Sequence, residues 1–320
     1  MTGRLASWAE LLRVSALCTV PGDALAGAAA TGLRPNRSTL LAIGSSLCLY
    51  EAGMALNDWA DRAEDAIDRP HRPIPSGRIT PRAALTASAA LTAAGLGLAA
   101  RASRPALAVA TALAATVWAY DLHLKHTPAG PAAMAGARAL DLLLGTVATS
   151  TGPSGRPTPA ASRGGRPTAT ALRSAALLGA HTYAVTSVSR HETQGGSTRT
   201  PLLALAATLT LAAKASRPTP APQPDGPPGP AGARTPTPSA GALVTAVLAA
   251  TYVRTPATPL LHAALNPSPP LVQRSVGAGI RAVIPLQATL SARAGAPGTA
   301  LAILCLAPLA RALARKVSPT

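Results

Sequence analysis

The stretch Asn57-Asp58-Trp59-Ala60-Asp61-Arg62-Ala63-Glu64-Asp65 closes an apolar segment with a dense group of acidic side chains. The whole chain of 320 residues has only 12 acidic residues. Six of them fall within a short window: Glu51, Asp58, Asp61, Glu64, Asp65 and Asp68. If this stretch is helical, the aspartates at 58, 61, 65 and 68 share one face, because their spacing follows the helical repeat. Hard cations such as Mg²⁺ take oxygen ligands and bridge carboxylates to phosphates, so the pattern predicts a diphosphate held through magnesium.

The alternative is a solvated helix end whose charges have no specific role, which is the usual explanation of an acidic run. Here the acids follow an apolar segment directly, in a chain that has few others. Clustered carboxylates repel one another, and the neighbouring Arg62, Arg69 and Arg72 neutralise them only in part. These observations favour a cation site.

The same residues resemble the first aspartate motif, Asn-Asp-x-x-Asp-x-x-x-Asp, of the UbiA superfamily of intramembrane prenyltransferases. The similarity continues through Asp68-Arg69-Pro70-His71-Arg72-Pro73-Ile74-Pro75-Ser76-Gly77-Arg78-Ile79, which looks like the loop that follows this motif in the family. The resemblance implies an all-α fold, a polytopic transmembrane helical bundle of about nine helices. It also implies a single integral membrane domain over residues 1–320.

The composition indicates a membrane protein independently of the motif. The chain is 48% hydrophobic and only 13% charged, with a mean hydropathy of +0.25. Soluble domains carry about 25% charged residues. The net charge of +17 raises the possibility of nucleic-acid binding. That class is excluded because aromatic residues make up only 2% and the arginines are dispersed between apolar spans.

Ten apolar segments are candidate spans, one more than the resemblance implies. They are 11–33, 38–58, 81–100, 104–122, 131–151, 169–189, 200–215, 240–262, 271–293 and 297–316. The weakest is 271–293, whose Arg274 and Arg281 suggest a place at the interface or beside a cavity. Two segments rich in Pro, Gly, Ser and Thr, 152–168 and 216–239, are predicted to be flexible loops.

Parity of the first six spans places the loops at 59–80, 123–130 and 190–199 on one face of the membrane. These loops carry the polar motifs. Arginines are as frequent in the opposite loops, so the positive-inside rule does not orient the chain. The resemblance implies that the motif face is cytoplasmic and that the membrane is the plasma membrane.

Further candidate residues lie in later segments. One segment reads Tyr120-Asp121-Leu122-His123-Leu124-Lys125. It is similar to a family segment whose lysine contacts diphosphate. The alternative is that Lys125 is an ordinary juxtamembrane lysine. Arg138 and Asp141 sit three residues apart inside a predicted span. Ionisable groups in a membrane pair or face a polar cavity, so both should point inward, as an ion pair or as a substrate contact.

The stretch from Ser187 to Gly196 stands where the family has its second aspartate motif. Glu192 is its only acidic residue, and Arg190 and His191 precede it. This departure resembles the EboC-like branch of the superfamily. It weakens a second metal position, whereas Arg190 can clamp a phosphate directly.

The resemblance implies a Mg²⁺-dependent prenyltransferase acting on an isoprenyl diphosphate donor and an unidentified small-molecule or lipid acceptor. Asp58, Asp61 and Asp65 are the predicted metal ligands, and Asp65 and Glu192 are the candidate catalytic bases. The predicted diphosphate-binding residues are Asn57, Arg72, Lys125, Arg138 and Arg190. One alternative is a non-catalytic protein that binds or exports prenyl diphosphates or lipids. Another is a CDP-alcohol phosphotransferase, whose upstream half-motif is missing here.

Overall fold

Helices are the only extended regular elements in the residues that the computed structural model describes, which are 3–151, 166–217 and 239–317. In chain order they are α1 (Gly3–Leu11), the 3-10 helix η1 (Val14–Thr19), α2 (Pro21–Ala30), α3 (Arg37–Ala60), α4 (Arg62–Asp68), α5 (Pro81–Ala102), α6 (Arg104–Ala119), the π-helical turn η2 (Tyr120–Leu124), α7 (Gly130–Ser150), α8 (Arg166–Ser189), α9 (Arg199–Ser216), α10 (Ala240–Leu265), α11 (Pro269–Arg293), α12 (Pro297–Leu304) and α13 (Leu306–Val317). The predicted all-α fold is confirmed.

Local sequence signals explain several helix starts. Proline at the first turn of a helix loses no intrahelical hydrogen bond, and a preceding Ser, Thr or Asn caps the free backbone N–H groups. Thr80 accepts a hydrogen bond from a backbone N–H of α5 just before Pro81, and Ser103 does the same at α6 before Pro105. Asn36 and the third residue of α3 form a reciprocal capping box.

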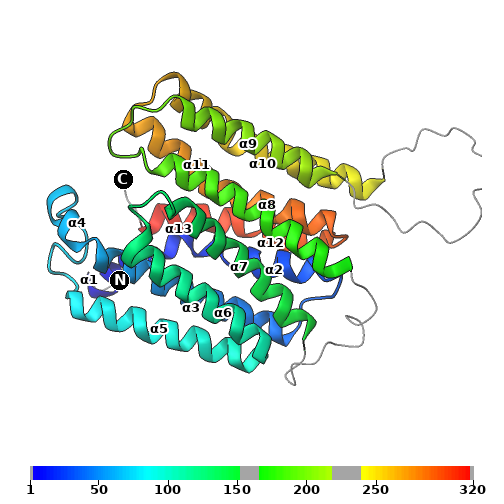
Figure 1. Ribbon diagram of the computed structural model, residues 1–320, viewed down its shortest axis with the longest axis horizontal. Coiled ribbons are helices and arrows are strands. Elements are labelled where there is room, and N and C mark those ends of the chain that lie inside the picture. The colour runs from blue at the N-terminus through cyan, green and yellow to red at the C-terminus, as the bar shows by residue number, and fades with distance from the viewer. Residues whose placement is uncertain (1–2, 152–165, 218–238, 318–320) are drawn as a thin grey trace, which may run out of the picture.

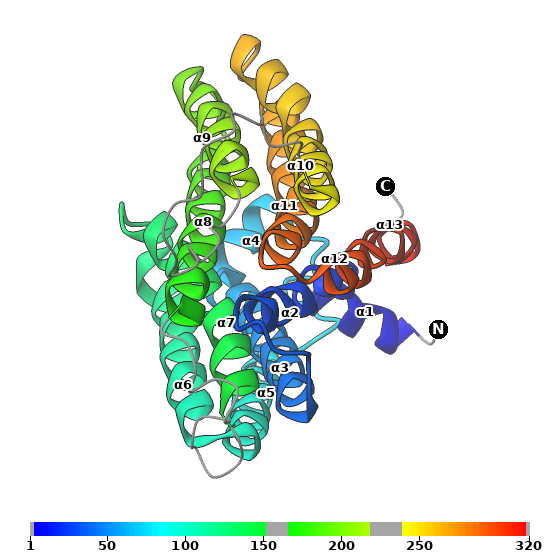
Figure 2. The same cartoon turned by 90° about the vertical axis from the view of Figure 1, so that its right-hand side faces the viewer.

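The long helices form two packed groups (Figure 1). One group contains α2, α3, α5, α6 and α7, and the other contains α8, α9, α10 and α11. Viewed after a quarter turn, α9 and α10 lie far from α5 and α6, with α2, α7 and α8 between them (Figure 2). The described residues hold eight helices of 16 residues or more, and the shorter α2 brings the number to nine.

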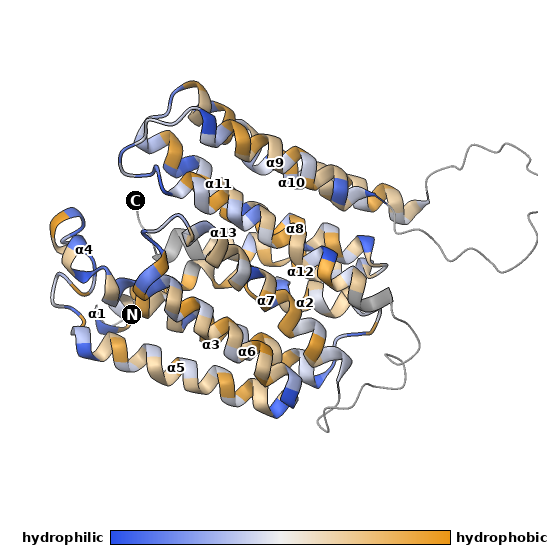
Figure 3. Cartoon of the chain, viewed as in Figure 1, coloured by the Kyte–Doolittle hydropathy of each residue, from blue (hydrophilic) through white to orange (hydrophobic). Residues whose placement is uncertain are grey.

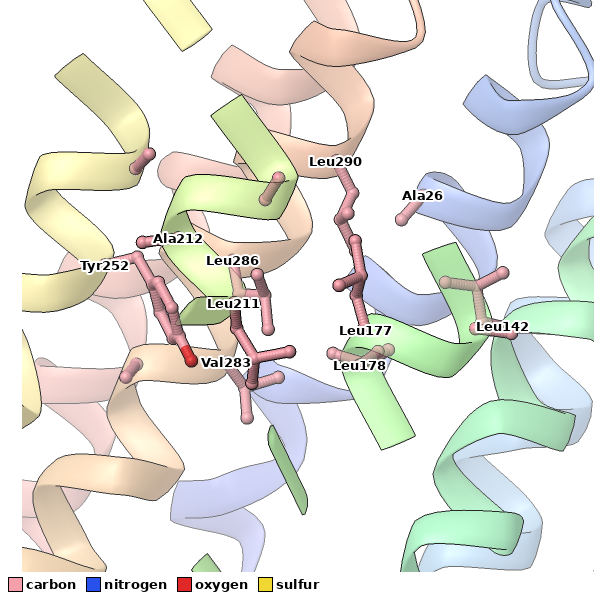
Figure 4. Close-up of a cluster of buried hydrophobic side chains, with 14 residues drawn as sticks. Ala26, Leu142, Leu177, Leu178, Leu211, Ala212, Tyr252, Val283, Leu286 and Leu290 are labelled. Atoms are coloured by element: carbon pink, nitrogen blue, oxygen red, sulfur yellow. The ribbon is translucent and has the colours of Figure 1, made fainter. Parts of the chain in front are cut away.

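A buried apolar cluster joins the two groups (Figure 4). Leu142 of α7 and Ala26 of α2 pack there with Leu178 of α8, Tyr252 of α10 and Leu286 of α11. These five helices therefore share one core. Its apolar side chains are buried only when both groups of helices are in place.

Two glycines allow α2 and α7 to approach closely. A Cβ atom at Gly145 would lie 2.4 Å from the backbone of Ala24, and one at Gly27 would lie 2.1 Å from the carbonyl oxygen of Leu142. Small residues at a helix crossing permit such backbone contact, which is the usual way that membrane helices associate.

Two predicted spans are wrong as single helices. The segment 11–33 is divided into the end of α1, η1 and α2, because Arg13 adopts a left-handed conformation (φ 49°) and Pro21 starts a new helix. The segment 297–316 is divided at Cys305 into α12 and α13. Helix α11 occupies the segment predicted to be the weakest span. Its residues 282–291 are all buried, whereas Arg274 and Arg281 themselves are exposed.

By length and composition, four of the described helices can cross a membrane: α3, α5, α6 continued through η2 to Leu124, and α7. Hydrophilic residues gather toward helix ends, notably the end where α4 lies (Figure 3). Residues 152–165 of the predicted loop 152–168 lie outside the described residues. The last three residues of that predicted loop belong to α8, which begins at Arg166. The predicted loop 216–239 lies outside them from 218 to 238.

Candidate active site

The first aspartate motif is located where α3 ends and α4 begins. Asp61 occupies the junction between the two helices, although its N–H still bonds to the carbonyl of Asn57 and its carbonyl accepts from Asp65. Asp58 and Asp65 are 5% and 4% exposed, whereas Asp68 is exposed to solvent. The expected stripe of four aspartates is therefore reduced to three carboxylates that face the bundle.

A single guanidinium lies between the two buried carboxylates. Arg72 Nη1 is 2.6 Å from Asp65 Oδ2 and 3.5 Å from Asp58 Oδ1. Arg69 approaches Asp65 at 3.8 Å. The two carboxylates thus converge on a shared cation position, and their oxygens are the hard donors that Mg²⁺ prefers. This arrangement fits a magnesium ion by its chemistry.

The loop after α4 folds back over the end of α3. Ile74 and Ile79 are buried against Ala55 of α3 and Leu11 of α1. Gly77 at the turn has a φ of +75°, a conformation that residues with a side chain rarely adopt. The loop therefore holds Arg72 over the carboxylates through its own apolar anchors.

The π-helical turn η2 brings a second set of polar groups to the site. Widening of the helix lets the N–H of Lys125 bond to the carbonyl of Tyr120, and Lys125 then forms an ion pair with Asp61. Asp121 is buried and accepts a hydrogen bond from Asn57 Nδ2 at 3.1 Å. Sequence reasoning gave no role to Asp121. A π-helical turn is a common feature of functional sites, but no simple sequence signal reveals it.

The loop after α8 reaches the same end of the bundle. Arg190 donates to the carbonyl of Thr127 at 2.7 Å, which ties this loop to the segment after η2. With the Lys125–Asp61 pair, this contact confirms that the three polar loops share one face. Burial raises the pKa of the Glu192 carboxyl above its ordinary value, and the positive charges of Arg69 and Arg13 offset part of that shift.

Arg138 lies elsewhere. Its Nε is 3.0 Å from Asp23 Oδ2, and its Nη2 donates to the carbonyl of Thr19 at 3.3 Å. Asp141 instead accepts a hydrogen bond from Ser46. Both residues point inward as expected, but Arg138 forms its ion pair with Asp23 on α2, and these contacts of Arg138 lie away from the aspartate motif.

A more exposed group lies beside Asp61. Ligand atoms of Asp61, Glu64 and His126 all fall within 4.8 Å of one another. His126 Nε2 lies 3.8 Å from Glu64 Oε1, and both side chains are largely exposed, so their contribution to a cation site is weaker than that of the buried carboxylates.

Together these features define an all-helical membrane bundle that presents carboxylates, arginines and a lysine at one end. The model of the UbiA prenyltransferase family matches residues 15–215, which is more than half of the chain. The chain therefore belongs to the UbiA prenyltransferase family, and it is an integral membrane protein. This match decides against the CDP-alcohol phosphotransferase alternative.

Individual relatives support the assignment. A digeranylgeranylglyceryl phosphate synthase of Methanothrix thermoacetophila is 37% identical over 140 residues, which are 43% of this chain and 50% of that relative. The match thus spans about half the length of the curated relative. A structure of a digeranylgeranylglyceryl phosphate synthase superposes with a TM-score of 0.57 at 17% identity, over 92% of this chain and 99% of the other.

A second solved structure, a UbiA homologue of Archaeoglobus fulgidus bound to GPP and Mg²⁺, gives a TM-score of 0.55 at 17% identity, over 89% of this chain and 99% of the other. At these identities the likeness concerns the fold alone.

Proposed function

We propose that this protein transfers an isoprenyl group from a prenyl diphosphate to an acceptor, with Mg²⁺ as cofactor. The observation that carries the proposal is the convergence of the buried Asp58 and Asp65 carboxylates on one cation position at the end of an apolar bundle. Lys125 and Arg72 supply positive charge at the same place. Carboxylates, cations and an adjacent apolar interior are the three elements that a prenyl diphosphate needs.

Asp58, Asp61 and Asp65 would hold the magnesium, which when bound supplies Lewis-acid stabilisation of the leaving diphosphate. In this structure Arg72 and Lys125 form ion pairs with the carboxylates. When those carboxylates ligate a cation instead, Arg72 and Lys125 are positioned to donate to phosphate oxygens. The Asn57 amide is oriented by Asp121 and can present its oxygen beside Asp58.

Arg190 is exposed at the rim of the site and can turn from the Thr127 carbonyl to a phosphate. Arg138 is held by Asp23 within the bundle, so we assign it to the interior polar network rather than to the diphosphate.

Glu192 is the better of the two candidate bases. Asp65 is engaged by two arginines, which occupy both of its carboxylate oxygens and leave neither free to take a proton from the acceptor. The raised pKa of Glu192 lies closer to neutrality, where a general base is most effective. In the proposed reaction the allylic C–O bond breaks and the diphosphate leaves with the electron pair. The acceptor's nucleophilic atom then bonds to the allylic carbon and passes its proton to Glu192.

The names of the relatives suggest the first substrates to test. The Methanothrix relative is named for the synthesis of digeranylgeranylglyceryl phosphate, and the Archaeoglobus homologue was solved with GPP and Mg²⁺. We propose geranylgeranyl diphosphate as donor and an acceptor that is a prenylated glycerol phosphate. We further propose that the α4 end of the bundle lies at the cytoplasmic face of the plasma membrane.

The test uses the purified full chain in detergent with radiolabelled geranylgeranyl diphosphate, Mg²⁺, and either geranylgeranylglyceryl phosphate or a total lipid extract as acceptor. A labelled product that disappears with EDTA and in Asp61→Ala would support the proposal. Magnesium-dependent donor binding without product, with both acceptors, would instead favour the non-catalytic alternative. Full activity in Asp61→Ala would contradict the assignment of the site.

A further inference from the structure

Arg13 lies at the junction of α1 and η1 in an unusual backbone conformation. Its φ and ψ angles are 49° and 48°, and it is the one residue other than glycine with a positive φ in the part of the chain that the structure describes. Left-handed backbone is unfavourable for residues with a Cβ atom and is concentrated at functional sites. The conformation therefore points to a reason for holding this side chain in place.

The guanidinium of Arg13 is directed into the aspartate site. Its Nη2 is 3.3 Å from Asp58 Oδ1, the same oxygen that Arg72 Nη1 approaches at 3.5 Å. Burial raises the pKa of Glu192, on the loop after α8, and the positive charge of Arg13 offsets part of that shift. An arginine from the N-terminal segment thus contacts a carboxylate of the aspartate motif, 45 positions away in the chain.

Arg72 is paired mainly with Asp65 at 2.6 Å, whereas Asp58 is the one carboxylate that Arg13 contacts among the described residues. The Arg13 side chain is 40% exposed, so it is open to a ligand as well as to Asp58. The two N–H groups of a guanidinium fork bind two oxygens of one anion, and a phosphate presents such a pair of oxygens. When Asp58 is engaged by a divalent cation, phosphate oxygens are the remaining anionic partners at this position.

The N-terminal helix is attached firmly to the loop that carries Arg72. Arg78 forms a two-pronged ion pair with Glu10, at 2.7 and 3.2 Å, and donates to the carbonyl of His71 at 2.6 Å. Leu11 and Trp8 pack in the same apolar cluster as the loop isoleucines. The Glu10–Arg78 pair is three residues from Arg13, so it restrains the direction in which Arg13 leaves α1.

We propose that Arg13 binds the diphosphate of the donor and that the Glu10–Arg78 ion pair is a positioning device for it. This inference rests on the proposed function, since it concerns the donor of that reaction. It makes the N-terminal segment part of the substrate site rather than a membrane-surface anchor.

The first measurement is equilibrium binding of radiolabelled geranylgeranyl diphosphate to the purified full chain in Mg²⁺. Loss of a charge-assisted contact in Arg13→Ala should weaken binding by about tenfold or more, and Arg13→Lys should lose less. Arg4→Ala is the matched control, because it removes an exposed arginine of the preceding helix α1 that has no part in the site. It should bind like the wild type.

The second measurement separates positioning from general stability. Glu10→Gln keeps the shape of the side chain and removes its charge, and it should weaken donor binding about threefold through Arg13. In an Arg13→Ala background the same change should have no further effect, because the residue that it positions is gone. An equal loss in both backgrounds would overturn the positioning role.

The outcomes distinguish this inference from the proposed function. Unchanged donor binding in Arg13→Ala, with wild-type protein that binds the donor in Mg²⁺, would overturn the inference alone. Failure of the wild type to bind the donor would overturn the proposed function and the inference with it. If Arg13→Ala does not fold, Arg13→Lys and the Glu10→Gln comparison decide, and wild-type affinity in both would overturn the inference.

Discussion

Replacement of Arg72 by alanine should separate its structural role from that of the magnesium. The Arg72 side chain is 20% exposed and contacts two carboxylates, at 2.6 and 3.5 Å, that are themselves buried. A hydrogen bond to a charged group contributes about 1.5–3 kcal/mol, and the longer contact adds less. Without Mg²⁺ we therefore expect a loss of about 2–3 kcal/mol in the free energy of unfolding, or about 5 °C in the melting temperature.

Magnesium should restore most of this loss. A ligand present at about 100 times its Kd stabilises the folded state by about 2.7 kcal/mol. In the wild type Mg²⁺ competes with the Arg72 guanidinium for the same oxygens, so its stabilising effect should be smaller there than in Arg72→Ala. The variant should nevertheless bind prenyl diphosphate more weakly, because a cation that faces the phosphate has been lost.

The assay is thermal unfolding of purified protein in detergent, with EDTA or with a Mg²⁺ titration. Arg62→Ala is the matched control, since Arg62 stacks on Trp59 at 4.6 Å and donates to its carbonyl without touching the carboxylates. Equal melting temperatures of Arg72→Ala and wild type in EDTA would refute the reasoning about the shared cation position. So would an equal increment from Mg²⁺ in both proteins.

Three further predictions concern the site and the bundle. Asp61→Ala should lower Mg²⁺-dependent turnover by about 100-fold or more, whereas the solvent-exposed Asp68→Ala should stay within about twofold, both measured by product formation. Gly145→Ala should destabilise the bundle by about 1–3 kcal/mol, because its Cβ atom would meet the α2 backbone at 2.4 Å. Gly136→Ala on the same helix, where a Cβ meets nothing within 4 Å, should melt like the wild type. Burial raises the pKa of Glu192, so its carboxyl stays protonated to higher pH than an ordinary glutamate and the rate should rise as pH passes that raised pKa. Glu192→Gln should lose this limb from the pH–rate profile, and a limb that persists unchanged would exclude Glu192 as the base.

Local chemistry explains why much of the helical layout could be predicted. Proline after Thr80 and at the start of α6 marks helix beginnings, and long Ala- and Leu-rich runs give the spans between them. The prediction of a single span failed where a long apolar run contains residues that end or start a helix. The apolar run from 11 to 33 looked continuous, but the left-handed Arg13 and the proline at 21 divide it.

The sequence alone determined the helical class, the membrane character and the carboxylate motif with its loop, because these depend on composition and on residues close together in the chain. Only the tertiary structure decided which charges meet. Arg13 reaches Asp58 across 45 positions, and Arg138 pairs with Asp23 rather than with Asp141, its neighbour in the sequence. The physical reason is that an ion pair forms between atoms a few ångströms apart, and that distance depends on how the helices pack and on where one π-helical turn directs Lys125 and Asp121.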